Sequence, residues 1–459
     1  MSEAAASPHV HARRRVLAAL FAAAAALNLA LLALYYFPSP KRLVGDESYY
    51  VALATAIASG QPAQHDPLWP PLYGEFVGLV FSIFGSRILV VQLIQMLLWA
   101  ATGYAFFRIV ERLYPSPGVA TTALALYLFS PELIAFTHYL WPETIHLFLM
   151  MTGLWLVIRH AGSYPAILAG GILFGLACLT KSLLLPVLFV IALFVFLVPT
   201  GGRTARDRAL RAALLVAAAV LTLLSASLAS RGGGERYTPT GSSVFNIWVG
   251  LNDTDRVDYR HRMAGSEHIE FVRSGPDHAA RNAVYIAKIQ EKLGQDGIAA
   301  TVIGQLSRQY FRLFDHDSFF TTQLMGGPRQ AYAFDAPALA RLLRVCAALL
   351  YGFVLIAGAA GIPFLRARPT GWSSFLLLFI AYNLAVFLFL HVVTRYRLQF
   401  LPMWIFFAAV SIDAGVRRWK GSGPAAAAGF AFTPARARLG LALGVVALVL
   451  AFRSLLPGS

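Results

Sequence analysis

Long uninterrupted runs of apolar residues constrain this chain more than any other feature. Such runs cover residues 16–37, 183–198 and 212–229, and a helix needs ~20 mostly apolar residues to cross a bilayer. A transmembrane barrel would instead show short alternating segments. The composition agrees, because 58% of the residues are hydrophobic and 13% are charged, against about 45–50% and about 25% in soluble domains. The sequence therefore predicts an all-α polytopic membrane protein and excludes soluble, disordered and coiled-coil classes.

About eleven segments are apolar and long enough to be expected as spans. They cover roughly residues 16–37, 86–110, 118–136, 143–159, 165–180, 182–198, 210–229, 338–362, 372–393, 398–415 and 438–455. The first run exceeds the ~7–15 apolar residues of a cleaved signal peptide, so a signal anchor is expected there. The spans define an N-terminal membrane module at 1–230, an outer domain at 231–337 and C-terminal spans at 338–459.

The net charge of +16 is unevenly distributed along the chain. If the N-terminus is cytoplasmic, the cytoplasmic loops hold 17 basic and 4 acidic residues, whereas the outer domain holds 12 of each. This is the positive-inside pattern of membrane proteins. The basic excess therefore indicates orientation, and nucleic acid is not an expected partner.

Both long connections are placed outside by this orientation, and both have helical signals. In the first outer loop, at 38–85, Tyr50, Leu53, Ala54 and Ile57 repeat at helical spacing, and ~14 apolar residues follow a proline-rich stretch. We expect two interfacial or re-entrant helices there. The outer domain shows helical patterns at 281–293 and 298–314, and a strand is expected around 244–249.

Small residues and cysteines inside the spans predict packing and not chemistry. Gly171 and Gly175 have the GxxxG spacing that lets two membrane helices approach closely. Both cysteines, Cys178 and Cys346, fall inside predicted spans. The outer domain therefore has no disulfide and is expected to be held by packing.

Charged residues of both signs gather near the outer ends of the spans. Ionisable groups at membrane depth are costly and usually pair or serve a function. The acids outside the outer domain and the cytoplasmic loops are Asp46, Glu47, Asp66, Glu75, Glu132 and Glu143, and the cations on that face are Lys41, Arg42, Arg87, Lys181, Arg395 and Arg397. This predicts a site of mixed charge at the outer boundary, with ordinary interfacial anchoring as the alternative.

Several short motifs, in order along the chain, resemble those of GT-C glycosyltransferases. They are GDESYYVALATAIASG after the first span, LWPPLY, WPETIHLFLMM, LTKS, FNIWVGLND at 245–253 and RYRLQFLP late in the chain. The chain looks like the bacterial branch that contains lipid A aminoarabinose transferase and protein O-mannosyltransferases. The resemblance covers nearly the whole chain in hydropathy and topology. Relatives often have a lysine before the proline of the first loop, where this chain has Trp69.

The resemblance implies transfer of a hexose or pentose from a polyprenyl-phosphate donor to a glycan, lipopolysaccharide, lipid or protein acceptor, with inversion. It also implies a bacterial inner-membrane protein whose active site faces the periplasm. A carboxylate would remove the acceptor proton, and fixed cations would stabilise the leaving phosphate. No cofactor is assigned, and a divalent metal is left open.

The resemblance and the charge pattern together assign candidate residues to three roles. The catalytic candidates are Asp46, as general base, with Glu47 and Glu143; the donor-phosphate candidates are Lys181, Arg395, Tyr396 and Arg397; the acceptor candidates are His65 and Glu132. Two arginines near the outer face oppose the positive-inside tendency and need anionic partners. Arginine also grips a phosphate with a planar pair of donors.

Each candidate has a plainer interpretation. Asp46 and Glu143 can serve helix starts, Lys181 can extend to water, and the arginines can anchor helix ends. His65 can be an inert loop histidine, and Glu132 can simply be solvated. For the whole chain, a transporter or lipid-linked sugar flippase is the alternative, although such proteins place polar groups near the midplane and repeat their halves. A non-catalytic receptor or scaffold would not need Asp46, Glu143 and the RYR segment together.

Overall fold

The computed structural model describes most of the chain, and helices account for its regular structure. The described residues are 8–36, 41–61, 66, 68–114, 116–199, 204–229, 241–252, 261–308, 310–316, 318, 321, 336–365, 371–421 and 432–453. Within these ranges the regular elements are α-helices and short 3-10 helices. The predicted all-α architecture is confirmed.

The helices follow one another with short connections in the first half of the chain and longer ones in the second. In the first half they are α1 (Pro8–Tyr36), α2 (Glu47–Ala58), α3 (Leu72–Phe84), α4 (Ile88–Leu113), α5 (Pro117–Leu128), α6 (Pro131–Ala135), α7 (Glu143–Arg159), α8 (Tyr164–Cys178), η1 (Ser182–Leu184), α9 (Leu185–Leu197) and α10 (Ala205–Ala229). In the second half they are α11 (Gly241–Asn252), α12 (His261–Arg273), α13 (His278–Asp296), α14 (Ile298–Arg308), η3 (Tyr310–Leu313), α16 (Pro337–Gly361), η4 (Ile362–Phe364), α17 (Trp372–Val386), η5 (Thr394–Gln399), α18 (Leu401–Trp419) and α19 (Pro434–Phe452).

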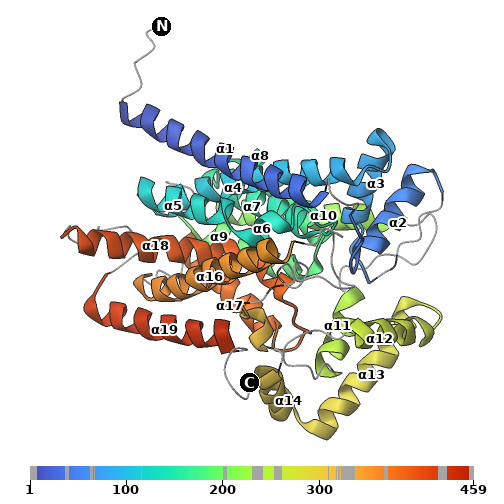
Figure 1. Cartoon of the computed structure of the whole chain (residues 1–459). Helices are drawn as coiled ribbons and strands as arrows, with labels where there is room; N and C mark the ends of the chain where they lie inside the picture. Colours follow the sequence, from blue (N-terminus) through green and yellow to red (C-terminus); the bar gives the residue numbers. More distant parts are fainter. Residues whose placement is uncertain are drawn as a thin grey trace.

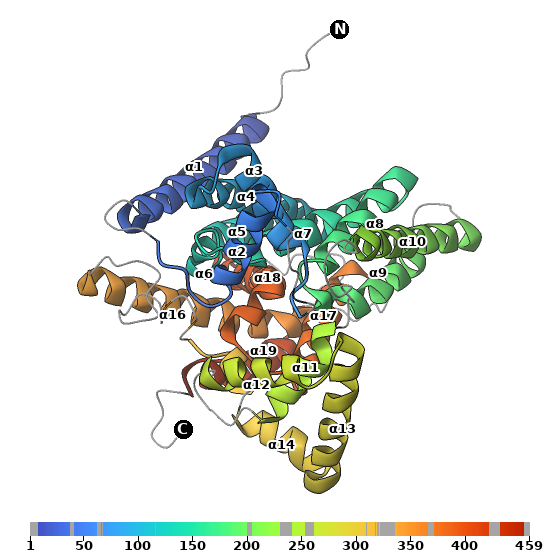
Figure 2. The same cartoon turned by 90° about the vertical axis from the view of Figure 1, so that its right-hand side faces the viewer.

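The long helices lie side by side, and α2 with α11–α13 lies beyond one end of them (Figure 1). We call this end of the bundle the α2 end. Viewed from this end, α11–α14 group together on one side (Figure 2). We call this group the α11–α14 domain.

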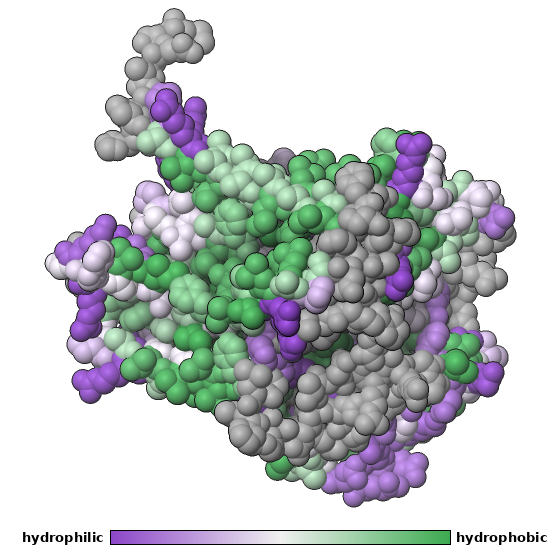
Figure 3. Space-filling view, viewed as in Figure 1, coloured by the Kyte–Doolittle hydropathy of each residue, from purple (hydrophilic) through white to green (hydrophobic). Residues whose placement is uncertain are grey.

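Five helices among the described residues are long and apolar enough to cross a membrane. They are residues 11–34, 88–113, 205–228, 337–364 and 434–452. Shorter apolar helices accompany them, and hydrophobic side chains cover the middle of the bundle while hydrophilic ones lie toward its ends (Figure 3). The protein is therefore a polytopic membrane protein, and the expected number of about eleven spans stays a prediction.

The structure corrects two expectations about local structure. The segment 118–136 is not one helix, because α5 ends at Leu128 and α6 begins at Pro131, and a proline interrupts the backbone hydrogen bonds of a helix. The strand expected at 244–249 is wrong, since these residues lie in α11. Helical spacing puts Val244, Phe245 and Trp248 together against the buried cluster of Leu68, Phe271 and Tyr285.

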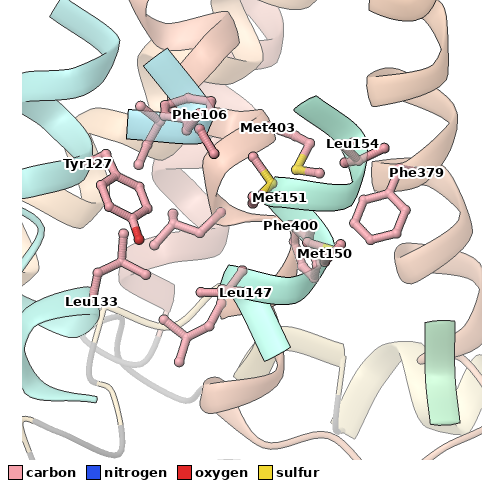
Figure 4. Close-up of a cluster of buried hydrophobic side chains, with 14 of the residues drawn as sticks. Phe106, Tyr127, Leu133, Leu147, Met150, Met151, Leu154, Phe379, Phe400 and Met403 are labelled. Carbon is pink, nitrogen blue, oxygen red and sulfur yellow. The ribbon is translucent and has the colours of Figure 1, made fainter. Parts of the chain in front are cut away.

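Helix α7 is the centre of the bundle. Leu147, Met150, Met151 and Leu154 along it lie among side chains of α4, α5, α6, α17 and α18 (Figure 4). A helix that is apolar on all sides is a buried helix. Its first residue, Glu143, is buried at the α2 end.

The GxxxG pair packs α8 against α10. A Cβ added at Gly171 would lie 2.5 Å from the carbonyl oxygen of Leu215, and one at Gly175 would lie 2.8 Å from that of Ala219. The close approach expected from the spacing is therefore present.

Gly171→Ala is expected to lower the thermal stability of the protein in detergent. The new methyl group overlaps the backbone of α10, and overpacking of this kind costs about 1–3 kcal/mol. Gly415→Ala is the matched control, because a Cβ at Gly415 in α18 meets no atom within 4 Å. Equal melting temperatures for the two variants would contradict the assigned contact.

Candidate active site

Asp46 directly precedes α2. Gly45 has φ +57, and a Cβ there would lie 3.3 Å from the Trp141 ring. This left-handed conformation, which glycine adopts at little cost, turns the chain into α2. Asp46 occupies the N-cap position but makes no side-chain cap hydrogen bond. The plainer interpretation of Asp46 as a helix cap is therefore not supported.

The Asp46 carboxylate instead forms an ion pair with Arg395. Nη2 of Arg395 donates to Oδ2 of Asp46 at 2.8 Å, and Nε of Arg395 lies 4.0 Å from Oε1 of Glu143. Arg395 thus bridges the acids that precede α2 and open α7. Burial acts to lower the pKa of Arg395, but the two acids outweigh it and the pKa is raised. Its guanidinium remains charged.

Lys181 completes this group from the turn between α8 and η1. Its Nζ donates to Oε1 of Glu143 at 2.8 Å. Burial lowers the pKa of Lys181, and the pair with Glu143 offsets part of that change. The lysine therefore points to an acid inside the protein. We call Asp46, Glu143, Lys181 and Arg395 the charged cluster.

Aromatic rings hold the two cations of the charged cluster in place. The Arg395 guanidinium lies 4.5 Å from the centre of the Trp141 ring, and Lys181 Nζ lies 5.5 Å from that of Tyr396. Such cation–π contacts are worth about 0.5–2 kcal/mol. The expected nearness of Lys181, Arg395 and Tyr396 is therefore observed.

The acids differ sharply in exposure. The side chain of Asp46 is 27% exposed, that of Glu143 is 2% exposed and that of Glu47 is 0% exposed. A group that takes a proton from an acceptor must be within hydrogen-bond reach of it. Asp46 is the most accessible of the three.

Glu47 supports the loop that carries Asp46. Its carboxylate accepts from the backbone N–H of Val44 and of Leu140, each at 2.7 Å, and pairs with Lys41 at 2.7 Å. Burial lowers the pKa of Lys41, and Glu47 offsets part of this. Glu47 thus ties the loop before α2 to the segment before α7, with no direct access to an acceptor.

Arg397 and Glu132 form a separate buried pair. Nε of Arg397 donates to Oε2 of Glu132 at 3.1 Å, and the guanidinium also donates to the carbonyl oxygen of Asp315 and lies 3.6 Å from the centre of the Tyr351 ring. The 3-10 helix η5 turns Arg395 and Arg397 to different partners. The resemblance assigned both arginines to the donor phosphate, but in the structure Arg395 pairs with Asp46 and Arg397 pairs with Glu132. Glu132 is buried and not solvated, and His65 lies outside the described residues.

Sequence reasoning overlooked Trp141 and His391. Trp141 directly precedes Pro142 and Glu143 and stacks on Arg395. His391 precedes the RYR segment, and its Nε2 lies 2.8 Å from the Tyr396 hydroxyl. Their position in sequence next to candidate residues was the only available signal. Among the described residues, no group of three His, Cys, Asp or Glu side chains could hold a metal ion.

Comparisons with known proteins identify the fold. Residues 69–228 match the family described as dolichyl-phosphate-mannose-protein mannosyltransferase. The chain is similar to the Archaeoglobus fulgidus oligosaccharyltransferase in the apo form, with 15% identity and a TM-score of 0.52, over 95% of this chain and 55% of that chain. The same organism's AglB, in complex with an inhibitory peptide and a dolichol-phosphate, gives 14% identity and a TM-score of 0.51, over 95% and 55%.

The chain is also similar to ArnT from Cupriavidus metallidurans bound to undecaprenyl phosphate. This match has 15% identity and a TM-score of 0.37, over 90% of this chain and 79% of that chain. No curated protein matches the sequence significantly. The chain spans about half the length of the oligosaccharyltransferases it resembles. It has the GT-C fold of membrane glycosyltransferases, as the motifs implied.

Proposed function

We propose that the protein is an inverting glycosyltransferase that moves a sugar from a polyprenyl-phosphate donor to an acceptor hydroxyl at the α2 end. The observation that carries this proposal is the charged cluster, in which an accessible carboxylate lies 2.8 Å from a partly buried arginine. The GT-C fold and the partial family match support it. The sugar is a hexose or pentose, and the acceptor is a glycan, a lipid or a protein.

Asp46 acts as the general base in this proposal. It takes the proton of the acceptor hydroxyl as that oxygen attacks the anomeric carbon, and the bond between this carbon and the phosphate oxygen breaks. The bonding electron pair leaves with the polyprenyl phosphate. Arg395 and Lys181 stabilise the charge that develops there. Glu143 holds both cations, because it lies within 4.0 Å of each.

The remaining candidates have supporting roles. Glu47 positions the loop of Asp46 through its bonds to Val44 and Leu140. Arg397 and Glu132 hold η5 against the bundle as a buried pair. Tyr396 orients Lys181, and His65 stays a candidate acceptor contact.

The test uses the purified full-length protein in liposomes with undecaprenyl phosphate carrying labelled hexoses or pentoses, and with envelope glycans, lipids and proteins as acceptors. The proposal expects labelled sugar to move to an acceptor and undecaprenyl phosphate to be released. A transporter or flippase would move the donor between leaflets without releasing undecaprenyl phosphate. Donor movement without sugar transfer would therefore refute the proposal.

The topology proposal places the N-terminus in the cytoplasm and both long connections in the periplasm of a bacterial inner membrane. The expected result is that cysteines introduced at residues 60 and 280 react with a membrane-impermeant maleimide from the periplasm, because basic residues concentrate in the other set of loops. A cysteine at residue 420, expected in the cytoplasm, is the control. Protection of residue 60 or 280 in intact cells would contradict this orientation.

A further inference from the structure

The α11–α14 domain contacts the segment that leads into η5. The carbonyl oxygen of Asn246 in α11 accepts from the backbone N–H of His391 at 3.3 Å. A Cβ added at Gly250 would lie 2.6 Å from the backbone nitrogen of His391 and 2.7 Å from the carbonyl carbon of Leu390. Because both neighbours are backbone atoms, a side chain at position 250 would push the helix and the segment apart.

Further bonds from the same half of the chain hold this contact. Nε2 of Gln305 in α14 donates to the Gly250 carbonyl oxygen at 2.6 Å. Nη1 of Arg312 in η3 donates to the carbonyl oxygen of Val392 at 3.3 Å. His391 is thus bonded to α11 through its backbone N–H, and Val392 is bonded to η3 through its carbonyl oxygen.

The His391 ring extends from this segment to the aromatic support of the charged cluster. Its Nε2 lies 2.8 Å from the Tyr396 hydroxyl, and His391 is 7% exposed. The Tyr396 ring stacks on Phe387 at 5.4 Å between centres and 9° between planes. Lys181 Nζ lies 5.5 Å from the centre of the Tyr396 ring, and Arg395 Cζ lies 5.7 Å from it.

We propose that His391 is a positioning residue. It fixes the Tyr396 ring, and this ring positions the donor-phosphate cations Lys181 and Arg395. The α11–α14 domain sets the position of His391, and so the position of the cations. This inference rests on the proposed function and adds to it a residue and a coupling between the α11–α14 domain and the donor site. The hydrogen bond with His391 holds the Tyr396 ring, and this one ring contacts both Lys181 and Arg395. Displacement of α11 then changes donor binding through Tyr396 and the two cations beside it.

The test compares His391→Phe, Tyr396→Phe and the double variant by their KM for the polyprenyl-phosphate sugar, their KM for the acceptor and their kcat. Phenylalanine keeps a ring at each site and removes the hydrogen bond. Each single variant is expected to raise the donor KM roughly tenfold, with an unchanged acceptor KM. The double variant should resemble the single ones, because both remove the same interaction. His391→Gln, which keeps a polar partner for Tyr396, should restore part of the donor KM.

Two further variants separate positioning from loss of stability. Gly250→Ala should raise the donor KM although residue 250 lies in α11, because its Cβ displaces residues 390–391. His316→Phe is the matched control: His316 is also 7% exposed, and its Nδ1 lies 3.1 Å from the carbonyl oxygen of Ala451. It should lower the melting temperature without changing the donor KM.

The outcomes distinguish this inference from the proposed function. Additive effects of His391→Phe and Tyr396→Phe, or an unchanged donor KM in Gly250→Ala, would overturn the inference while sugar transfer by the wild type still stands. No sugar transfer by the wild-type protein would overturn the proposed function and the inference with it.

Discussion

Asp46→Asn is expected to lower the rate of sugar transfer by about 10²–10⁴-fold, the usual effect of losing a general base. The amide has the shape of the carboxylate but cannot take a proton from the acceptor. Asp46 is the candidate acid with the greatest side-chain exposure, at 27%, so this loss should exceed that of any other acid at the α2 end. Turnover of the purified variant, relative to folded protein, measures it.

Glu75→Gln is the control for this prediction. Glu75 is an exposed acid in the first turn of α3, in the same loop as Asp46 but outside the charged cluster. It should keep wild-type turnover. Full turnover by folded Asp46→Asn would exclude the assignment of Asp46 as the base.

Arg395→Ala is the second large effect we expect, with a loss of about 10²–10³-fold in transfer, because a fixed donor to the leaving phosphate disappears. The donor KM should also rise. Arg395→Lys should restore only part of the activity, since an ammonium does not present the planar pair of donors that a guanidinium presents. Steady-state kinetics over a range of donor concentrations measures both effects.

Arg397→Ala tests whether the rise in donor KM is specific to Arg395. Arg397 is 2% exposed and its partner Glu132 would remain buried without a cation, which costs about 3–5 kcal/mol. We therefore expect less folded protein and a lower melting temperature, with a near-normal donor KM in the folded fraction. If Arg397→Ala raised the donor KM and Arg395→Ala did not, the roles of the two arginines would be reversed.

Much of the architecture could be predicted from hydropathy and local spacing. The helical spacing over 50–57 and the helical pattern at 281–293 correspond to α2 and α13, because hydrophobic periodicity is a local property of the sequence. The strand expected at 244–249 failed for a tertiary reason. Phe271 and Tyr285, distant in sequence, offer an apolar surface that a helix at 241–252 covers with Val244, Phe245 and Trp248.

The roles assigned to the nine candidate residues stay predictions, but their geometry can be compared with them. Charge counting and motifs selected Asp46, Glu143, Lys181 and Arg395 among the nine, and the structure brings these four together. Sequence could not separate Arg395 from Arg397, because the 3-10 turn of η5 and the distant carboxylate of Glu132 decide where each guanidinium points. Nor could it show that Glu47 is fully buried, since Val44 and Leu140 supply its partners.

Within the charged cluster, Asp46 acts as the base and Arg395 binds the donor phosphate. One paired measurement tests these two roles most directly. Binding of the undecaprenyl-phosphate sugar and its transfer are measured side by side on the wild type, Asp46→Asn and Arg395→Ala in the same liposomes. The proposed roles predict that Asp46→Asn binds the donor like the wild type yet transfers almost no sugar, whereas Arg395→Ala binds the donor weakly. Equal donor binding and equal transfer in all three proteins would contradict them.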